Sequence, residues 1–413
     1  MPKDRPTILQ IVPQLDAGGA ELSAVEIAEA VVMGGGRALV LAEPGRLTER
    51  IVAAGAEAIS FPAATKNPFK LLTNARAIRG MTAALGVDLI HARSRAPAWS
   101  GLLAARRAGV PFVTTYHGAY NETNALKRFY NGVMARGDVV IANSRYTADL
   151  IAARYGAPRE RLEVIHRGVD AMAFDPAAVA PTRVAALRDN WGVQPEQRVI
   201  LQAARLTRWK GQLPLIEAAG RLYQAGRLQD AVIVLAGDAQ GREAYVQELH
   251  AHIRRHDLQG RVLLVGHVKD MAAAYLAAHV TVVASIEPEA FGRTAIEAAA
   301  LGCPVIATNI GAPPETVLAQ PVVPAEQTTG WLVPPDDSDA LAKALAAALD
   351  LPPIERSAMA QRARRHVLTH FTVEAMQRRT LAVYDRLLAT ELENRFCTAC
   401  SHSREQPESA SQP

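Results

Sequence analysis

Short runs of β-branched and aliphatic residues alternate along this chain with longer stretches whose apolar residues recur at helical spacing. This alternation predicts βαβ units, in which parallel strands are joined by helices that pack on the sheet. In the first half we expect a helix over 22–33 and strands over 7–12, 38–41, 89–91, 112–116, 139–143 and 162–165. In the second half we expect a helix over 212–225 and strands over 198–203, 231–236, 262–265, 280–284 and 304–307.

Two such series predict an α/β protein with two tandem Rossmann-like domains that face one another across a cleft. We expect an N-terminal domain over 1–175 and a C-terminal domain over 176–371, joined by a linker within 170–197. Residues 352–392 read as helical with a break near Phe371. The polar residues 396–413 predict a disordered tail.

Composition narrows the class of protein. The 413 residues are 49% hydrophobic and 21% charged, which excludes disordered and collagen-like chains. The three cysteines are typical of a reducing compartment, and we interpret the pair Cys397 and Cys400 near His402 as incidental. We find no signal-peptide pattern and no apolar run long enough to span a membrane, so we expect a cytoplasmic protein.

The net charge of +4 is unevenly distributed, with +5 in residues 1–175 and −1 in residues 176–413. The basic stretch between Glu57 and Glu122 favours an anionic partner, either a phosphorylated or lipid-linked acceptor or the cytoplasmic face of an inner membrane. Aromatic residues make up only 5% of the chain, so we expect no nucleic acid partner. The residues that we assign to acceptor or membrane contact are Lys66, Lys70, Arg93 and Arg95. Residues 66–79 can form a basic helix with Phe69, Leu72 and Ile78 on lipid, or a surface helix packed on its own domain.

Loops that follow strands carry the candidate chemistry. Gly18 and Gly19 follow the first strand and allow a backbone approach to an anion, although an ordinary tight turn explains them equally well. The loop lacks GxGxxG, which excludes a dinucleotide-dependent oxidoreductase. Arg205 and Lys210 follow the first strand of the second half, where two cations suit a departing diphosphate; the alternative is a solvated basic loop.

A third loop holds Glu289, and Glu297 follows eight positions later in the next helix, with Gly292 between them. Gly292 lets phosphate approach the first amides of the next helix, and Glu297 on that helix can accept ribose hydroxyls. Structural salt bridges are the alternative for both carboxylates. His117 ends another strand, where a neutral imidazole can meet a sugar hydroxyl or phosphate.

Together these motifs resemble the retaining, nucleotide-sugar-dependent glycosyltransferases of family 4, which have the GT-B architecture. The resemblance spans residues 7–390. Within the family, the chain is most similar to bacterial enzymes that build lipopolysaccharide core or other envelope glycans. The resemblance rests on Gly18 to Glu21, His117-Gly118, Gly168 to Asp170, Arg205 with Lys210, Glu289 to Glu297, and Gly330 to Pro335. Where the family commonly has Asn, this chain has Arg167, which leaves the role of that Asn open.

The resemblance implies a role for each matching residue. Arg205 and Lys210 would bind the donor diphosphate together with the Gly19 backbone. Glu297 would bind the ribose hydroxyls, and Glu289 would bind hydroxyls of the transferred sugar. Other donor contacts implied are His117 near the reacting carbon, the main chain of Gly266, His267 and Val268 at the nucleobase, and the amides around Phe291, Gly292 and Arg293. The last helix, about 372–392, would cross back to the N-terminal domain.

The implied reaction moves a hexose-type sugar with retention from a UDP- or GDP-linked donor to a glycan or lipid-linked acceptor. The cations Arg205 and Lys210 would do the work of a divalent ion, so we expect no metal and no other cofactor. A covalent role for Glu289 is less favoured than sugar positioning. The alternatives are a sugar-nucleotide epimerase and a non-catalytic sugar-nucleotide-binding protein of the same architecture.

Overall fold

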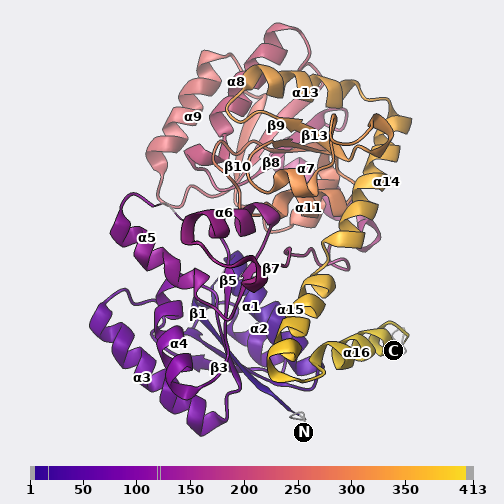
Figure 1. Cartoon of the computed structure of the whole chain (residues 1–413). Helices are drawn as coiled ribbons and strands as arrows, with labels where there is room; N and C mark the ends of the chain where they lie inside the picture. Colours follow the sequence, from indigo (N-terminus) through magenta and orange to yellow (C-terminus); the bar gives the residue numbers. More distant parts are fainter. Residues whose placement is uncertain (1–4, 17, 119, 121, 406–413) are drawn as a thin grey trace. The chain divides into compact units, whose positions relative to one another are not determined.

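The computed structural model describes residues 5–16, 18–118, 120 and 122–405. It divides the chain into two compact units, Met1–Arg167 with Val373–Pro413, and Gly168–Thr372. Each unit is a parallel sheet covered on both faces by helices (Figure 1). The α/β class and the two Rossmann-like domains are therefore confirmed.

The sheet of the N-terminal unit has the strand order β3-β2-β1-β4-β5-β6-β7. Its strands are β1 (Thr7–Gln14), β2 (Arg37–Glu43), β3 (Glu57–Ser60), β4 (Leu89–Ala92), β5 (Phe112–Tyr116), β6 (Val139–Ala142) and β7 (Leu162–Val164). Its helices are α1 (Gly19–Met33), α2 (Thr48–Ala53), α3 (Pro68–Leu85), α4 (Arg95–Ala108), α5 (Ala125–Asn131), α6 (Arg145–Tyr155), α15 (Val373–Leu388) and α16 (Leu392–Glu405).

Side chains alternate between the two faces of this sheet, as the pleat requires. Along β1, Ile8 and Val12 pack in a core with α1, α15 and α16, whereas Leu9 and Ile11 pack in a second core with α3 and α4. Both faces are buried, which explains why the strands read as continuous apolar runs. The prediction that the last helix returns to the N-terminal domain is confirmed, because Tyr384 of α15 is buried in the first of these cores.

The sheet of the C-terminal unit has the order β10-β9-β8-β11-β12-β13. Its strands are β8 (Arg198–Ala203), β9 (Ala231–Ala236), β10 (Val262–Gly266), β11 (Ala278–Val283), β12 (Val305–Thr308) and β13 (Gly330–Val333). Its helices are α7 (Pro181–Trp191), α8 (Gln212–Gln224), α9 (Glu243–Arg255), α10 (Met271–Ala277), α11 (Arg293–Ala300), α12 (Pro313–Thr316), α13 (Ser338–Asp350) and α14 (Pro353–His370). One core packs the sheet against α8, α9 and α13, and the other packs it against α7, α10 and α11.

Two predictions about irregular segments are wrong. Residues 170–197 contain the helix α7, whose Trp191 is buried beneath the sheet, and are not simply a linker. Residues 396–405 continue the helix α16 instead of forming a disordered tail, because Leu392 and Phe396 are buried against the N-terminal core. Residues 406–413 lie outside the described part of the chain.

Candidate functional site

The C-terminal unit reverses its strand order between β8 and β11. The chain continues from β8 to β9 on one side, while β11 pairs with β8 on the other side. In open parallel sheets, ligands bind beyond the carboxyl ends of the strands at such a switch point. The loops that follow these two strands carry Arg205, Lys210 and Glu289.

Lys210 and Glu289, 79 residues apart in sequence, form an ion pair with Nζ 2.5 Å from Oε1. The hydroxyl of the fully buried Ser285 donates to the same oxygen at 2.6 Å. The Lys210 ammonium also lies 4.2 Å from the centre of the Trp209 ring. The side chains are only 17% and 10% exposed, so this is a partly desolvated charge pair in which electrostatic interactions are stronger than in water.

The two loops are tied together by the backbone. Gly211 has φ +72°, and a Cβ there would lie 1.8 Å from the carbonyl oxygen of Ala284. The amide of Ile286 donates to the Trp209 carbonyl at 2.8 Å, and the Gln202 side chain donates to the Lys210 carbonyl at 2.7 Å. These contacts fix the position from which Lys210 reaches Glu289.

Arg205 is exposed at the start of the same loop. Its backbone carbonyl accepts a hydrogen bond from Gln212 Nε2 at 3.0 Å, and the Tyr245 hydroxyl donates to Gln212 Oε1 at 3.0 Å. The backbone of Arg205 is therefore anchored while its guanidinium faces solvent. The structure thus places the exposed Arg205 and the largely buried Lys210 on the loop after β8, as the sequence predicts.

Glu297 lies on α11, which begins after Gly292 at φ +84° and has no capping side chain. Its carboxylate accepts from the Tyr275 hydroxyl at 3.1 Å and lies 3.3 Å from Arg293 Nε. Burial and the neighbouring carboxylate raise the pKa of Tyr275 well above its usual value. Both predicted glutamates are therefore ion-paired. Phe291 is buried against Phe371, so only its backbone can reach a ligand.

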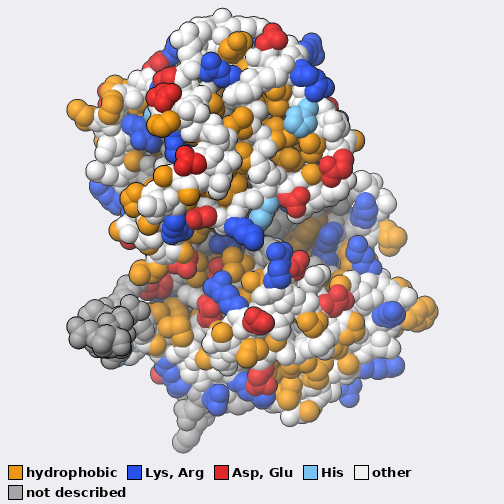
Figure 2. Space-filling view, turned by 180° about the vertical axis from the view of Figure 1, so that it is seen from behind, with side chains coloured by type: hydrophobic (Ala, Val, Ile, Leu, Met, Phe, Trp, Pro, Cys, Tyr) orange, Lys and Arg blue, Asp and Glu red, His pale blue; other side chains and the backbone are white. Residues whose placement is uncertain are grey.

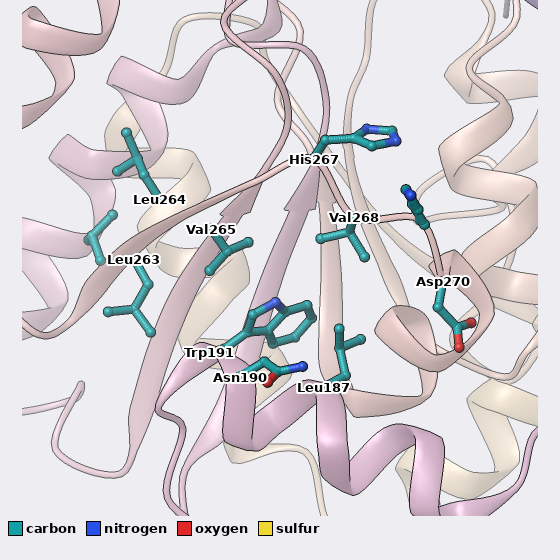
Figure 3. A pocket seen from close by; sticks show the side chains of 11 residues that line it. Leu187, Asn190, Trp191, Leu263, Leu264, Val265, His267, Val268 and Asp270 are labelled. Carbon is teal, nitrogen blue, oxygen red and sulfur yellow. The ribbon is translucent and has the colours of Figure 1, made fainter.

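A separate pocket of about 620 Å³ lies between α7 and β10. His267 and Val268 line it, which places part of the predicted nucleobase segment at a cavity large enough for a base. Figure 3 shows Trp191 and Leu187 reaching from α7 toward Val265 and Val268, with the His267 ring pointing away. Arg205, Lys210, Glu289 and Glu297 do not line this pocket.

In the N-terminal unit, Gly18 precedes the first turn of α1 and no side chain caps the helix. A Cβ on Gly19 would lie 2.3 Å from Arg167 Nη1, so this guanidinium packs directly on the glycine loop. Arg167 Nη2 donates to His117 Nδ1 at 2.6 Å. His117 Nε2 is buried, and a contact between this imidazole and a sugar hydroxyl would require the ring to move.

The four residues predicted for acceptor or membrane contact have different surroundings. Lys66 and Lys70 are exposed at the start of α3. Arg95 donates to Asn131 at 2.8 Å and stacks on Tyr120, 4.2 Å from the ring centre. The prediction is wrong for Arg93, which is 3% exposed and donates from Nε to Gln10 at 2.7 Å.

The surface itself carries mixed charge. On the described part of the face drawn in Figure 2, Lys and Arg side chains are interspersed with Asp and Glu. Within the described residues, no group of three or more His, Cys, Asp or Glu side chains is arranged to hold a metal ion. None of the described helices is both long and apolar enough to cross a membrane.

Comparisons with known proteins identify the family to which this chain belongs. Residues 17–172 match the family described as Glycosyltransferase Family 4, and residues 184–366 match Glycosyl transferases group 1. A D-inositol 3-phosphate glycosyltransferase from Kribbella flavida is 31% identical over 89% of this chain and 91% of its own length. This chain belongs to the family 4 glycosyltransferases. The matched part is shorter in other relatives of this name, for example 56% of the length of the one from Xylanimonas cellulosilytica.

Solved structures agree with this family. A glycosyltransferase from Rickettsia africae is 32% identical, with a TM-score of 0.85 over 94% of this chain and all of the other. Anabaena HepE, solved in complex with UDP-glucose, is 26% identical, with a TM-score of 0.77 over 92% of this chain and all of the other. The GT-B fold and glycosyltransferase membership are thereby established for this chain.

Sequence reasoning missed the residues that hold the glycosyltransferase loops in place. Ser285 holds the Glu289 carboxylate by a hydrogen bond. Its position directly after an apolar strand is the sequence feature that could have indicated this role. Gly311 packs on the other side, where a Cβ would lie 2.4 Å from the Glu289 carbonyl oxygen. That contact joins segments more than twenty residues apart, and no local pattern indicates it.

Proposed function

We propose that this chain transfers a hexose from UDP-sugar to a phosphate-bearing acceptor, with retention of the anomeric configuration. The observation that carries the proposal is the Lys210–Glu289 pair at the switch point of the C-terminal sheet, beside the exposed Arg205. A relative of the same fold, HepE, is solved with UDP and glucose, which supports a UDP-linked donor. The epimerase and binding-protein alternatives are not favoured by the named relatives.

Charge is the main contribution that these side chains make to the reaction. As the bond between the anomeric carbon and the diphosphate oxygen breaks, negative charge grows on the leaving group. Arg205 and Lys210 stabilise that charge, and a single preorganised donor of this kind typically contributes about 10²–10³ in rate. To reach the diphosphate, the Lys210 ammonium exchanges its contact with Glu289 for one with phosphate.

Glu289 then becomes free to accept hydrogen bonds from hydroxyls of the transferred sugar, with Ser285 holding Oε1 in place. The acceptor hydroxyl attacks on the face that the diphosphate leaves, and the departing phosphate oxygen takes its proton. In this path no side chain is needed as a base. The Glu297 carboxylate accepts hydrogen bonds from the ribose hydroxyls, which replace its contacts with Tyr275 and Arg293.

The acceptor assignment combines charge with the names of the relatives. The N-terminal unit carries the excess of basic residues, and several relatives are named for transfer to D-inositol 3-phosphate. We therefore propose a small phosphorylated polyol as the first acceptor to test. A phosphorylated glycan of lipopolysaccharide or another envelope polysaccharide has the same anionic chemistry and is the second.

The test pairs donor binding with transfer. Purified protein is screened by thermal shift against UDP-glucose, other UDP-sugars and GDP-sugars, and then assayed with D-inositol 3-phosphate by detection of free UDP. Lys210→Ala should lower kcat by about 100-fold or more. Lys343→Ala changes an exposed lysine of the same unit and serves as the control. Equal rates for the two variants, or UDP-glucose consumption without transfer to any acceptor, would contradict the proposal.

We also propose a cytoplasmic location with peripheral contact to an anionic membrane through the start of α3. Phe69 is 78% exposed and Leu72 is 49% exposed, next to Lys66 and Lys70. Ile78 is fully buried, so the predicted apolar contact at that position is wrong. Co-sedimentation with anionic vesicles should decrease for Phe69→Ser with Lys70→Ser, and binding that is equal for anionic and neutral vesicles would refute the electrostatic part.

A further inference from the structure

A small cavity lies inside the N-terminal unit, between α1, α15 and the carboxyl ends of β4, β5 and β6. Its volume is about 20 Å³, enough for one water-sized occupant and too small for a sugar or phosphate. All of its lining residues belong to this unit. They include Arg93, His117, Asn143 and Arg167.

Three of these side chains have buried polar atoms without a hydrogen-bond partner in the described structure: Arg93 Nη2, His117 Nε2, and both amide atoms of Asn143. Arg93 is 3% exposed and Asn143 is 1% exposed. Leaving one such buried group unsatisfied costs about 1–3 kcal/mol, and more for a charged group. Several unsatisfied groups around one cavity therefore indicate an occupant.

The chemistry of these atoms defines the occupant. A guanidinium can only donate, so His117 Nδ1 must accept the 2.6 Å hydrogen bond from Arg167. In a neutral imidazole the proton then resides on Nε2, which becomes a donor. Burial, followed by the charges of Arg167 and Arg93, lowers the pKa of His117 well below its usual value and keeps the ring neutral.

Arg93 Nη2, His117 Nε2 and the Asn143 amide nitrogen thus give three N–H donors, against one acceptor, the Asn143 oxygen. A water molecule has two acceptor lone pairs and cannot accept hydrogen bonds from all three donors. A halide can accept from each of them and leaves only the Asn143 oxygen without a donor. Two guanidinium groups, Arg93 and Arg167, line the same cavity. The Glu26 carboxylate also faces Arg93 and partly compensates its charge, and Tyr384 lies beside the same guanidinium, but neither residue lines the cavity.

We propose that this cavity is a binding site for a single monovalent anion of chloride size, held by Arg93, His117 and Asn143. The bound anion would join the ends of β4, β5 and β6 and support the Arg167 guanidinium against the glycine loop at Gly19. The site does not depend on the identity of the sugar donor or the acceptor.

Two measurements on the full chain test the site. Crystals grown in sodium bromide should show an anomalous peak in the cavity at the bromine absorption edge. At constant ionic strength, Tm should rise by about 5 °C when sodium gluconate is replaced by sodium chloride. A non-anomalous water peak in the cavity, or equal Tm values in the two salts, would overturn the proposal.

Variants separate anion binding from general stability. Asn143→Leu fills the cavity with an apolar group, and Asn143→Asp keeps the size but places a carboxylate there; each should abolish the chloride dependence of Tm. Asn131→Leu is the matched control, because Asn131 is also 1% exposed in this unit and lies outside the cavity. It should lower Tm while leaving the chloride dependence unchanged. If Asn143→Leu and Asn143→Asp keep the wild-type chloride response, the site is wrong.

Discussion

Gly211 provides the sharpest test of how the donor loop is built. It has φ +72°, and a Cβ there would meet the Ala284 carbonyl oxygen at 1.8 Å, far inside van der Waals contact. Alanine at a left-handed position alone costs about 1–2 kcal/mol. The clash is with backbone and cannot be relieved by a side-chain rotation, so the loop carrying Lys210 or the end of β11 must move. With an overpacking cost of about 1–3 kcal/mol added, we expect Gly211→Ala to lower the free energy of unfolding by about 4 kcal/mol.

Gly192 isolates the two contributions to this loss. It has φ +70° in the same unit, but a Cβ there meets no atom within 4 Å. Gly192→Ala should therefore show the conformational cost alone, a fall in Tm of about 2–8 °C, against about 8–16 °C for Gly211→Ala. Scanning calorimetry measures both Tm values, and UDP titration should show weaker binding for Gly211→Ala only. Similar Tm values for the two variants would refute the steric argument.

The remaining predictions concern pH, the C-terminal helix and metal. Burial lowers the pKa of His91 and His117 well below the usual value, so the unfolded chain binds more protons below about pH 6.5 and stability should fall as pH drops toward 5. His91→Gln should flatten that fall by up to about 1.4 kcal/mol per pH unit; an unchanged slope would contradict it. Phe396→Ala should lower the free energy of unfolding by about 3–4 kcal/mol, and with it Tm, because Phe396 is 1% exposed. Phe69→Ala, at an exposed position, should leave Tm unchanged, and equal Tm values for the two variants would support a disordered tail instead. Transfer should persist in a metal chelator, because Arg205 and Lys210 supply the positive charge; loss of activity that Mg²⁺ or Mn²⁺ restores would contradict this.

Local sequence predicts the regular part of this fold well. Strands β5, β8 and β9 begin and end where their apolar runs predict, because parallel strands buried on both faces need continuous apolar residues. The break between α14 and α15 at Phe371 is also predicted. The edge strands β3 and β13 are not among the predicted strands.

The sequence predicts which loops carry the candidate site, but it does not predict which of their side chains contact one another. Loop position and residue type indicate Arg205, Lys210, Glu289 and Glu297. The direct pairing of Lys210 with Glu289 depends on β8 and β11 being neighbours, which is a property of the strand order. Residues that act through shape, such as Gly311, are not identified, because the backbone that they approach belongs to a distant segment.

What the sequence determined by itself is the series of strands and helices, the two domains, and the residue types at the strand ends, because these depend on short-range periodicity. Only the tertiary structure decided which charges are buried. Arg93 looked like part of a basic surface, yet it lies in the core beside Gln10. His91 of the preceding strand forms a hydrogen bond with Tyr384, 293 residues away. The polar segment after Leu392 likewise forms a helix because two of its side chains pack on a core built from the other end of the chain. Burial of a given side chain depends on contacts between distant segments, and a local pattern does not specify them.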